Sequence, residues 1–285
     1  MKKVFCAFII FTLFIIFASC VASYAEGNAK SGEELMIGDS FFFGAYEQDY
    51  DFKDDKLLLE IEPVEWIVIA KEQDKALLLS KYVIDSKPYN DVNQDISWSE
   101  SSIREYLNGE FMDYCFSEAE KAAILKSEVY NNADRDDAWT TDAGRDTEDY
   151  IFLLSYKQAA KTIPFLSNSE ENRKATATIC AEKMSADTPF SKGVWWWLRS
   201  PGKKPNQAIY VRDSGLFDYK EVNGVGWGIR PALWLDLNTD FSTFDYEAYE
   251  RVHDAFVARN YVDVYTDPFI ELLQTEHGRK NYGIL

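Results

Sequence analysis

The sequence predicts an α+β fold with a mostly antiparallel, irregular sheet flanked by helices. Short runs of alternating or β-branched residues, which are typical of strands, occur in both halves of the chain. Capping boxes, which mark the beginnings of helices, lie between these runs. Strands therefore come first, then helices, then strands again, without the regular strand–helix alternation that a doubly wound parallel sheet requires.

Seven strands are predicted, because each segment is short, rich in β-branched or aromatic residues and bounded by turn residues. They are residues 41–46, 64–70, 76–80, 150–155, 195–199, 208–212 and 229–235.

Three helices are predicted to begin at capping boxes, in which a serine and a glutamate or glutamine three residues later satisfy each other's backbone N–H groups. The pairs are Ser97 with Glu100, Ser117 with Glu120, and Ser155 with Gln158. Between the second and third of them, residues 131–149 are polar and acidic and predict a long surface loop.

The composition excludes several classes of protein. The chain has 285 residues, 46% of them hydrophobic, which is enough for a buried core. The 48 acidic and 30 basic residues give a net charge of −18, which argues against nucleic acid as a partner. Only two histidines are present, so metal or triad chemistry based on histidine has little material.

Residues 1–25 are predicted to be a signal peptide. Lys2 and Lys3 precede an apolar stretch, and Ser23-Tyr24-Ala25 is an acceptable cleavage site. Lipoprotein processing at Cys20 is the alternative, and both routes place the protein outside the cell or at its surface. The apolar stretch is shorter than the ~20 residues that a spanning helix needs, so no transmembrane segment is expected once the leader is removed.

The mature chain is predicted to contain one domain, residues 26–238, followed by a helical C-terminal extension, residues 239–285. The extension is expected because Phe244, Ala248 and Val252 recur near helical spacing. Cys115 and Cys180 remain after cleavage at Ala25. They allow either one disulfide or two buried free thiols, and the sequence does not place them near each other.

Several short motifs are distributed in a fixed order over about 200 residues. They are Ile-Gly-Asp at 37–39, Phe-Gly-Ala-Tyr at 43–46, Pro-Val-Glu-Trp at 63–66, Ser-Ile-Arg-Glu-Tyr-Leu-Asn at 102–108, Trp-Trp-Leu-Arg-Ser-Pro-Gly at 196–202 and Gly-Ile-Arg-Pro-Ala-Leu-Trp-Leu at 228–235. With these motifs, the segment from about Leu35 to Leu237 resembles a bacterial family known as domain of unknown function 6273. The resemblance implies an exported or surface module whose activity is not established.

The closing Gly-x-Arg strand is also similar to the end of the C-type-lectin-like fold, including its formylglycine-generating-enzyme branch. This second resemblance implies a C-type-lectin-like core. The Trp-rich segment and the Gly-Ile-Arg-Pro segment are then expected to be neighbouring strands of one sheet, with Arg199 and Arg230 held inside the protein.

The candidate ligand-binding residues are Trp196, Arg199, Tyr210 and Arg212, because flat aromatic rings and guanidinium groups are common in glycan sites. A second set is interpreted as structural. It consists of Glu65, which is expected to pair with an arginine, and of Trp66, Arg104, Arg230 and Trp234.

No metal site and no cofactor are expected. Residues 132–136 begin like a calcium loop, but Asp137 stands where that loop needs glycine and Ala143 where it needs glutamate. The sequence therefore favours a binding or interaction module with a glycan or a surface protein as partner. A hydrolase or oxidoreductase that uses carboxylates or a metal is the alternative.

Overall fold

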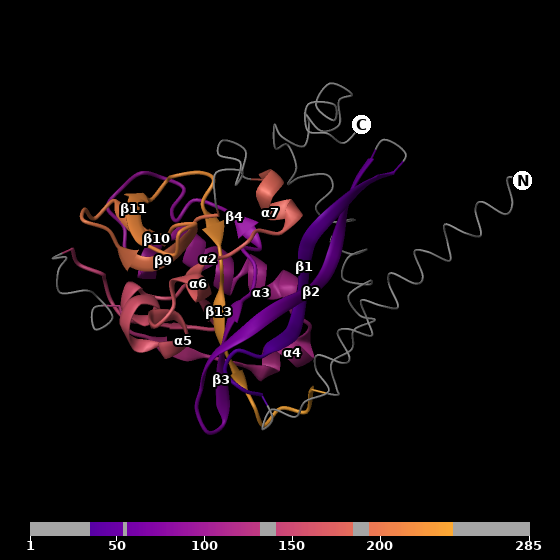
Figure 1. Cartoon of the computed structure of the whole chain (residues 1–285). Helices are drawn as coiled ribbons and strands as arrows, with labels where there is room; N and C mark the ends of the chain where they lie inside the picture. Colours follow the sequence, from indigo (N-terminus) through magenta and orange to yellow (C-terminus); the bar gives the residue numbers. More distant parts are fainter. Residues whose placement is uncertain (1–34, 54–55, 132–140, 185–193, 242–285) are drawn as a thin grey trace, which may run out of the picture.

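The computed structural model describes residues 35–53, 56–131, 141–184 and 194–241. Its strands and helices form the mixed α+β fold that the sequence predicts, with curled sheets and short helices (Figure 1). The leader, Cys20 and nearly all of the predicted C-terminal extension lie outside the described residues. None of the helices in the described part of the chain is both long and apolar enough to cross a membrane.

The first sheet has the strand order β1-β2-β3-β13-β5, and β8 also pairs with β13. Its strands are β1 (Ser40–Lys53), β2 (Lys56–Lys71), β3 (Lys75–Ser80), β5 (Ile124–Leu125), β8 (Ile151–Phe152) and β13 (Ala232–Asp236). All of its strand pairs are antiparallel. β1 and β2 form a long hairpin that projects from the body of the molecule (Figure 1).

The second sheet has the order β11-β10-β9-β12-β4. Its strands are β4 (Asp85–Ser86), β9 (Trp196–Pro201), β10 (Gln207–Val211), β11 (Phe217–Glu221) and β12 (Gly228–Ile229). Gly228 is paired with Trp196, in a parallel pair. The Trp-rich and Gly-Ile-Arg-Pro segments are therefore neighbouring strands, as predicted, and Arg199 and Arg230 are both buried.

The predicted strand at 229–235 is broken in two at Arg230 and Pro231, since proline has no N–H to donate to a sheet. Ile229 ends β12 in the second sheet, and Ala232 begins β13 in the first. Arg230 holds this junction: its Nε donates to the Ser80 carbonyl at 2.8 Å, and its guanidinium lies 5.1 Å from the centre of the Trp196 ring. Burial lowers the pKa of Arg230 to about 9.

Short helices connect the strands. They are α2 (Ser102–Asn108), α3 (Glu110–Cys115), α4 (Glu118–Ala123), α5 (Pro164–Ser167), α6 (Glu170–Arg173) and α7 (Ile179–Met184), with a 3-10 turn at Trp98–Glu100 and a π turn at Gln158–Thr162. The capping box of Ser117 and Glu120 is present at α4, as predicted. Ser155 and Gln158 also exchange their predicted hydrogen bonds, but they introduce the π turn.

The first predicted helix begins later than expected. Ser97 makes no capping bond, and its hydroxyl is bonded to that of Ser99. The cap is Ser101, whose side chain accepts from the Arg104 N–H at 3.4 Å. The predicted cap at Ser97 is therefore wrong, and the helix is capped four residues later.

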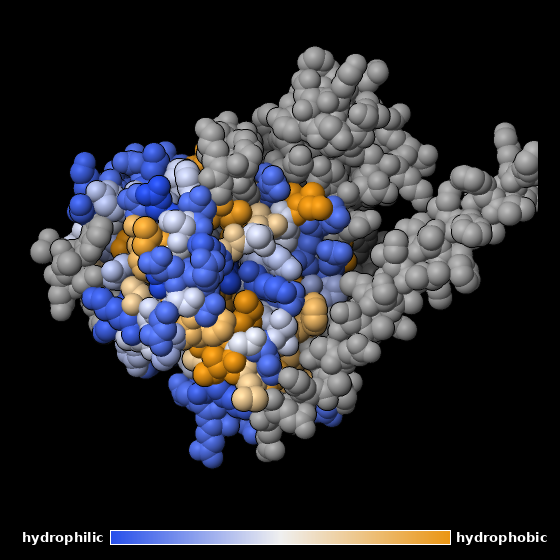
Figure 2. All heavy atoms as spheres, viewed as in Figure 1, coloured by the Kyte–Doolittle hydropathy of each residue, from blue (hydrophilic) through white to orange (hydrophobic). Residues whose placement is uncertain are grey.

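A third, two-stranded sheet includes the end of the segment predicted to be a loop. β6 (Ser127–Val129) pairs with β7 (Thr147–Asp149), so the end of the predicted 131–149 loop is a strand. In the view of Figure 2, hydrophilic residues cover most of the described surface, and apolar residues show only in small areas between them.

Candidate functional site

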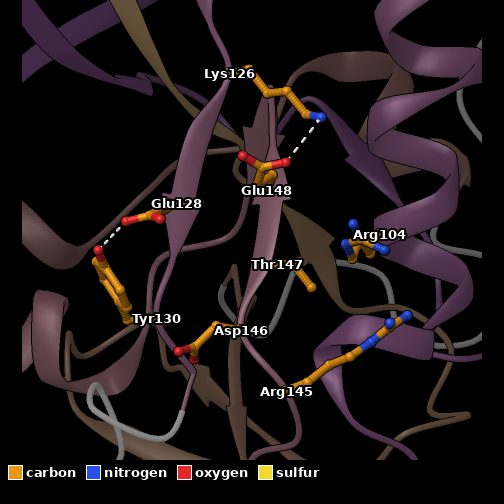
Figure 3. A pocket seen from close by; sticks show the side chains of 8 residues that line it. All are labelled: Arg104, Lys126, Glu128, Tyr130, Arg145, Asp146, Thr147 and Glu148. Atoms are coloured by element: carbon orange, nitrogen blue, oxygen red, sulfur yellow. Dashed lines mark hydrogen bonds and ion pairs between the residues drawn. The ribbon is translucent and has the colours of Figure 1, made fainter.

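A polar cleft of about 480 Å³ lies over the β6–β7 hairpin, and Figure 3 shows the side chains that line it. It is lined by Arg104, Lys126, Glu128, Tyr130, Arg145, Asp146, Thr147 and Glu148. Three side chains are cationic and three are anionic, so the cleft offers many hydrogen-bond donors and acceptors, and its lining is more polar than apolar.

The strand periodicity of the hairpin directs its side chains. Val129, Thr147 and Asp149 are buried, whereas Glu128 and Glu148 are exposed and stand directly opposite each other. Like charges in that position repel, and each carboxylate has its own partner. Lys126 lies 3.3 Å from Glu148, and the Tyr130 hydroxyl donates to Glu128.

Tyr130 places an aromatic residue at the edge of the cleft, and this residue is 48% exposed. The hydrogen bond to Glu128 raises the pKa of its phenol. The phenol and the Glu128 carboxyl group therefore form one hydrogen-bonded unit at this edge of the cleft.

Asp149 forms the rigid base beneath the cleft. Its side chain is fully buried and accepts three hydrogen bonds, from Arg104 Nε at 2.7 Å, Thr147 Oγ1 at 2.7 Å and Trp98 Nε1 at 2.9 Å. Arg104 Nη1 also donates to the Ser99 carbonyl at 3.1 Å. These bonds fix the plane of the Arg104 guanidinium, which is a partly exposed wall of the cleft.

Asn131 ties the end of β6 to the residues that precede β7. Its backbone N–H donates to Asp146 Oδ1, and its amide Nδ2 donates to the Arg145 carbonyl, both at 2.7 Å. Asn131 Oδ1 accepts in turn from Arg199 Nε at 3.2 Å, and Arg199 Nη2 donates to the Tyr130 carbonyl at 3.2 Å. A buried arginine thus positions the exposed residues of the cleft.

All eight cleft residues fall in the part of the chain that the family comparison covers. Residues 73–237, more than half of the chain, match the model of the family described as a domain of unknown function, DUF6273. The chain belongs to the DUF6273 family. The match begins after the β1–β2 hairpin, later than the Leu35 expected from the motifs. No curated protein and no solved structure matches the chain.

Within the DUF6273 segment, the four residues predicted to bind a ligand do not form one surface. Trp196, Arg199 and Tyr210 are buried, with 0%, 3% and 7% of their surface exposed. β9 and β10 lie inside the second sheet and side chains cover both of their faces, so no ligand reaches these three in the structure. Arg212 is exposed and lies 3.7 Å from Asp218.

Each buried candidate has a specific role in packing. Trp196 Nε1 donates to the Arg173 carbonyl at 3.0 Å. Tyr210 packs edge-on against the rings of Trp197 and Trp227. Arg199 donates from Nη1 to the Leu153 carbonyl and to Gln158, in addition to the bonds that support the cleft.

The residues interpreted as structural are integrated into the fold. Glu65 forms an ion pair with Lys81 at 2.9 Å and accepts a hydrogen bond from the Ser40 hydroxyl. The partner is therefore a lysine and not the arginine that was expected, because Lys81 follows directly after β3, which is paired with β2. The ion pair with Glu65 raises the pKa of Lys81. Trp66 is buried and donates to the Phe43 carbonyl at 2.6 Å. The Lys75 ammonium lies 4.6 Å from the centre of the Trp234 ring.

Cys115 and Cys180 are separate, buried free thiols, which is the second of the two alternatives that the sequence left open. Burial raises the pKa of both thiols. In the described part of the chain, no three His, Cys, Asp or Glu side chains are grouped so that they could hold a metal ion. The calcium-like sequence at 132–136 lies outside the described residues.

Sequence reasoning missed seven of the eight cleft residues and assigned only Arg104, as structural. The alternation of exposed and buried residues in Ser127–Val129 and Thr147–Asp149 is a strand signal that could have found the hairpin. Each strand has only three residues, and 17 residues separate them, so neither the usual strand length nor a short turn identified the pair.

Proposed function

We propose that this chain is an exported or cell-surface binding module with a C-type-lectin-like core, and that it binds a glycan in the polar cleft. The observation that carries the proposal is the lining of the cleft: charged donors and acceptors of both signs beside one half-exposed tyrosine. Sugars present many hydroxyl groups, each both a donor and an acceptor, together with apolar ring faces that stack on aromatic side chains.

The support beneath the cleft favours binding over a purely structural role. Asp149 and Arg199, which are both buried, fix Arg104, Tyr130 and Asn131 before any ligand arrives. A site that is fixed in advance loses little conformational entropy on binding. An apolar ligand is disfavoured, because it would remove water from six charged groups without replacing their hydrogen bonds.

Replacing Tyr130 by alanine is expected to weaken binding of the best oligosaccharide in a glycan panel about tenfold, since an aromatic contact contributes about 1–1.5 kcal/mol. Isothermal titration calorimetry on the full chain measures the effect. Tyr150→Ala is the matched control, because Tyr150 is 37% exposed and does not line the cleft.

Two outcomes of this experiment would count against the proposal. If no oligosaccharide binds, the glycan function is contradicted. If binding persists and Tyr130→Ala leaves it unchanged, the ligand lies elsewhere than in the cleft. Release of sugars from the panel during incubation would instead favour the carboxylate-dependent hydrolase.

Export is tested separately. Expression of the whole chain in a bacterial host is expected to give a mature protein that begins at Glu26, measured by intact mass after isolation from the medium or the envelope. The reason is the basic and apolar leader that ends at Ala25. A lipid-modified mass that disappears in Cys20→Ser would identify the lipoprotein route, and a full-length cytoplasmic chain would contradict export.

A further inference from the structure

The two sides of the cleft differ in charge. Figure 3 shows Arg104 and Arg145 on one side, and Glu128 and Tyr130 on the opposite side. A ligand that fills the cleft therefore meets guanidinium donors along one edge and a carboxylate with a phenol along the other.

Arg104 has donor capacity that no residue in the described part of the chain uses. Its Nε is bonded to Asp149 and its Nη1 to the Ser99 carbonyl, and neither bond involves Nη2. The side chain is 26% exposed and lines the cleft. Because the other two nitrogens are fixed, the free N–H groups of Nη2 have a defined direction.

Arg145 supplies a second guanidinium in the same cleft. It is exposed, and its side chain makes no hydrogen bond or ion pair within the described residues, whereas its carbonyl is anchored by Asn131. The other cleft cation, Lys126, is already paired with Glu148. Among the described residues that line the cleft, Arg104 and Arg145 are therefore the cations whose guanidinium N–H groups remain available to a ligand.

We infer that the glycan is acidic and that its carboxylate binds between Arg104 and Arg145, while its hydroxyls donate to the carboxylates of the opposite side. This inference rests on the proposed function and names the ligand class of the same cleft. A planar carboxylate matches the paired N–H groups of a guanidinium, and charge-assisted hydrogen bonds of this kind are about twice as strong as neutral ones.

Because the whole chain is acidic, the attraction between the two arginines and an acidic glycan acts only at short range, within the cleft. At −18, the protein as a whole repels an anionic glycan at a distance. Added salt screens that repulsion, so the association rate for an acidic sugar is expected to rise with ionic strength, opposite to a protein that attracts anions through a basic surface.

The test uses uronic-acid oligosaccharides and their methyl esters, which differ in charge and share the same hydroxyl pattern. Arg145→Ala in the full chain is expected to weaken binding of the free acid 10- to 100-fold and to leave binding of the ester within twofold. Arg145→Lys is expected to recover only part of the loss, because lysine keeps the charge without the planar fork. Arg212→Ala is the control, because Arg212 is exposed and lies outside the cleft. This variant is expected to bind the acid and the ester with unchanged affinity.

The inference is overturned if the esters bind as tightly as the acids, or if Arg145→Ala weakens both ligands equally. In that case, a loss of neutral-sugar binding in Tyr130→Ala would still support the proposed function. The inference also fails if only neutral oligosaccharides bind. Since Arg145 is exposed, a change in the thermal unfolding temperature is not expected, and this measurement separates loss of binding from loss of folding.

Discussion

Replacing Asp149 by alanine is expected to lower the free energy of unfolding by about 3–5 kcal/mol, which is one of the two largest effects predicted for this chain. The carboxylate is fully buried, and it accepts from Arg104, Thr147 and Trp98. Without it, a partly buried guanidinium and a buried indole N–H lose their partner, and unsatisfied groups of this kind are costly. Urea unfolding monitored by tryptophan fluorescence measures the change.

Asp218→Ala is the matched control. Asp218 also faces an arginine, Arg212, but this pair is 3.7 Å apart and both side chains are more than 40% exposed. Exposed pairs contribute about 0–1 kcal/mol. Equal losses in the two variants would contradict the assignment of Asp149 as the base of the cleft. Asp149→Ala is also expected to weaken ligand binding, because Arg104 loses its fixed orientation.

Gly215→Ala is expected to destabilise the chain by about 3 kcal/mol or more. Gly215 lies in the turn between β10 and β11 with φ +80°, and a Cβ atom there would stand 2.3 Å from the Glu170 carbonyl oxygen of α6. The left-handed conformation alone costs a side chain about 1–2 kcal/mol. The contact adds overpacking against backbone, which costs a further 1–3 kcal/mol or so.

Gly38→Ala separates these two causes. Gly38 has φ +97°, but an added Cβ would meet only the Phe165 ring at 3.6 Å, an ordinary contact. The free energy of unfolding of Gly38→Ala is therefore expected to fall by about 1–2 kcal/mol, because of the backbone conformation alone. Thermal unfolding of both variants gives the comparison, and a loss at Gly38 as large as that at Gly215 would rule out the contact with α6 as a cause.

The elements predicted well are those whose signal is local. The capping box at Ser117 depends on residues three apart, and the strands at 41–46 and 76–80 depend on short apolar runs, so both were found in the sequence. The position of Arg199 and Arg230 inside neighbouring strands was also predicted correctly. The break at Pro231, which sends its two sides to different sheets, depends on long-range packing and was not predicted.

The cleft was not predicted either, because burial by distant segments cannot be recognised from local sequence. The prediction concentrated on Trp196, Arg199 and Tyr210, which have the side chains of a binding site but lie in strands that are covered on both faces. Their burial depends in part on segments that are distant in the sequence, such as Leu153, whose carbonyl accepts from Arg199 Nη1. Arg199 still contributes to the site, since it holds Asn131 and Tyr130 from below.

The junction at Arg230 and Pro231 determines at which stage of synthesis the two sheets can be completed. β12 lies between β9 and β4 in one sheet, and β13 lies between β3 and β5 in the other, although both are the last strands of the described chain to leave the ribosome. The second sheet is therefore complete only once Ile229 has been synthesised, and the first only once Asp236 has been synthesised. Non-local pairing of this kind is slow, so the two sheets are expected to close only after most of the described chain has been synthesised.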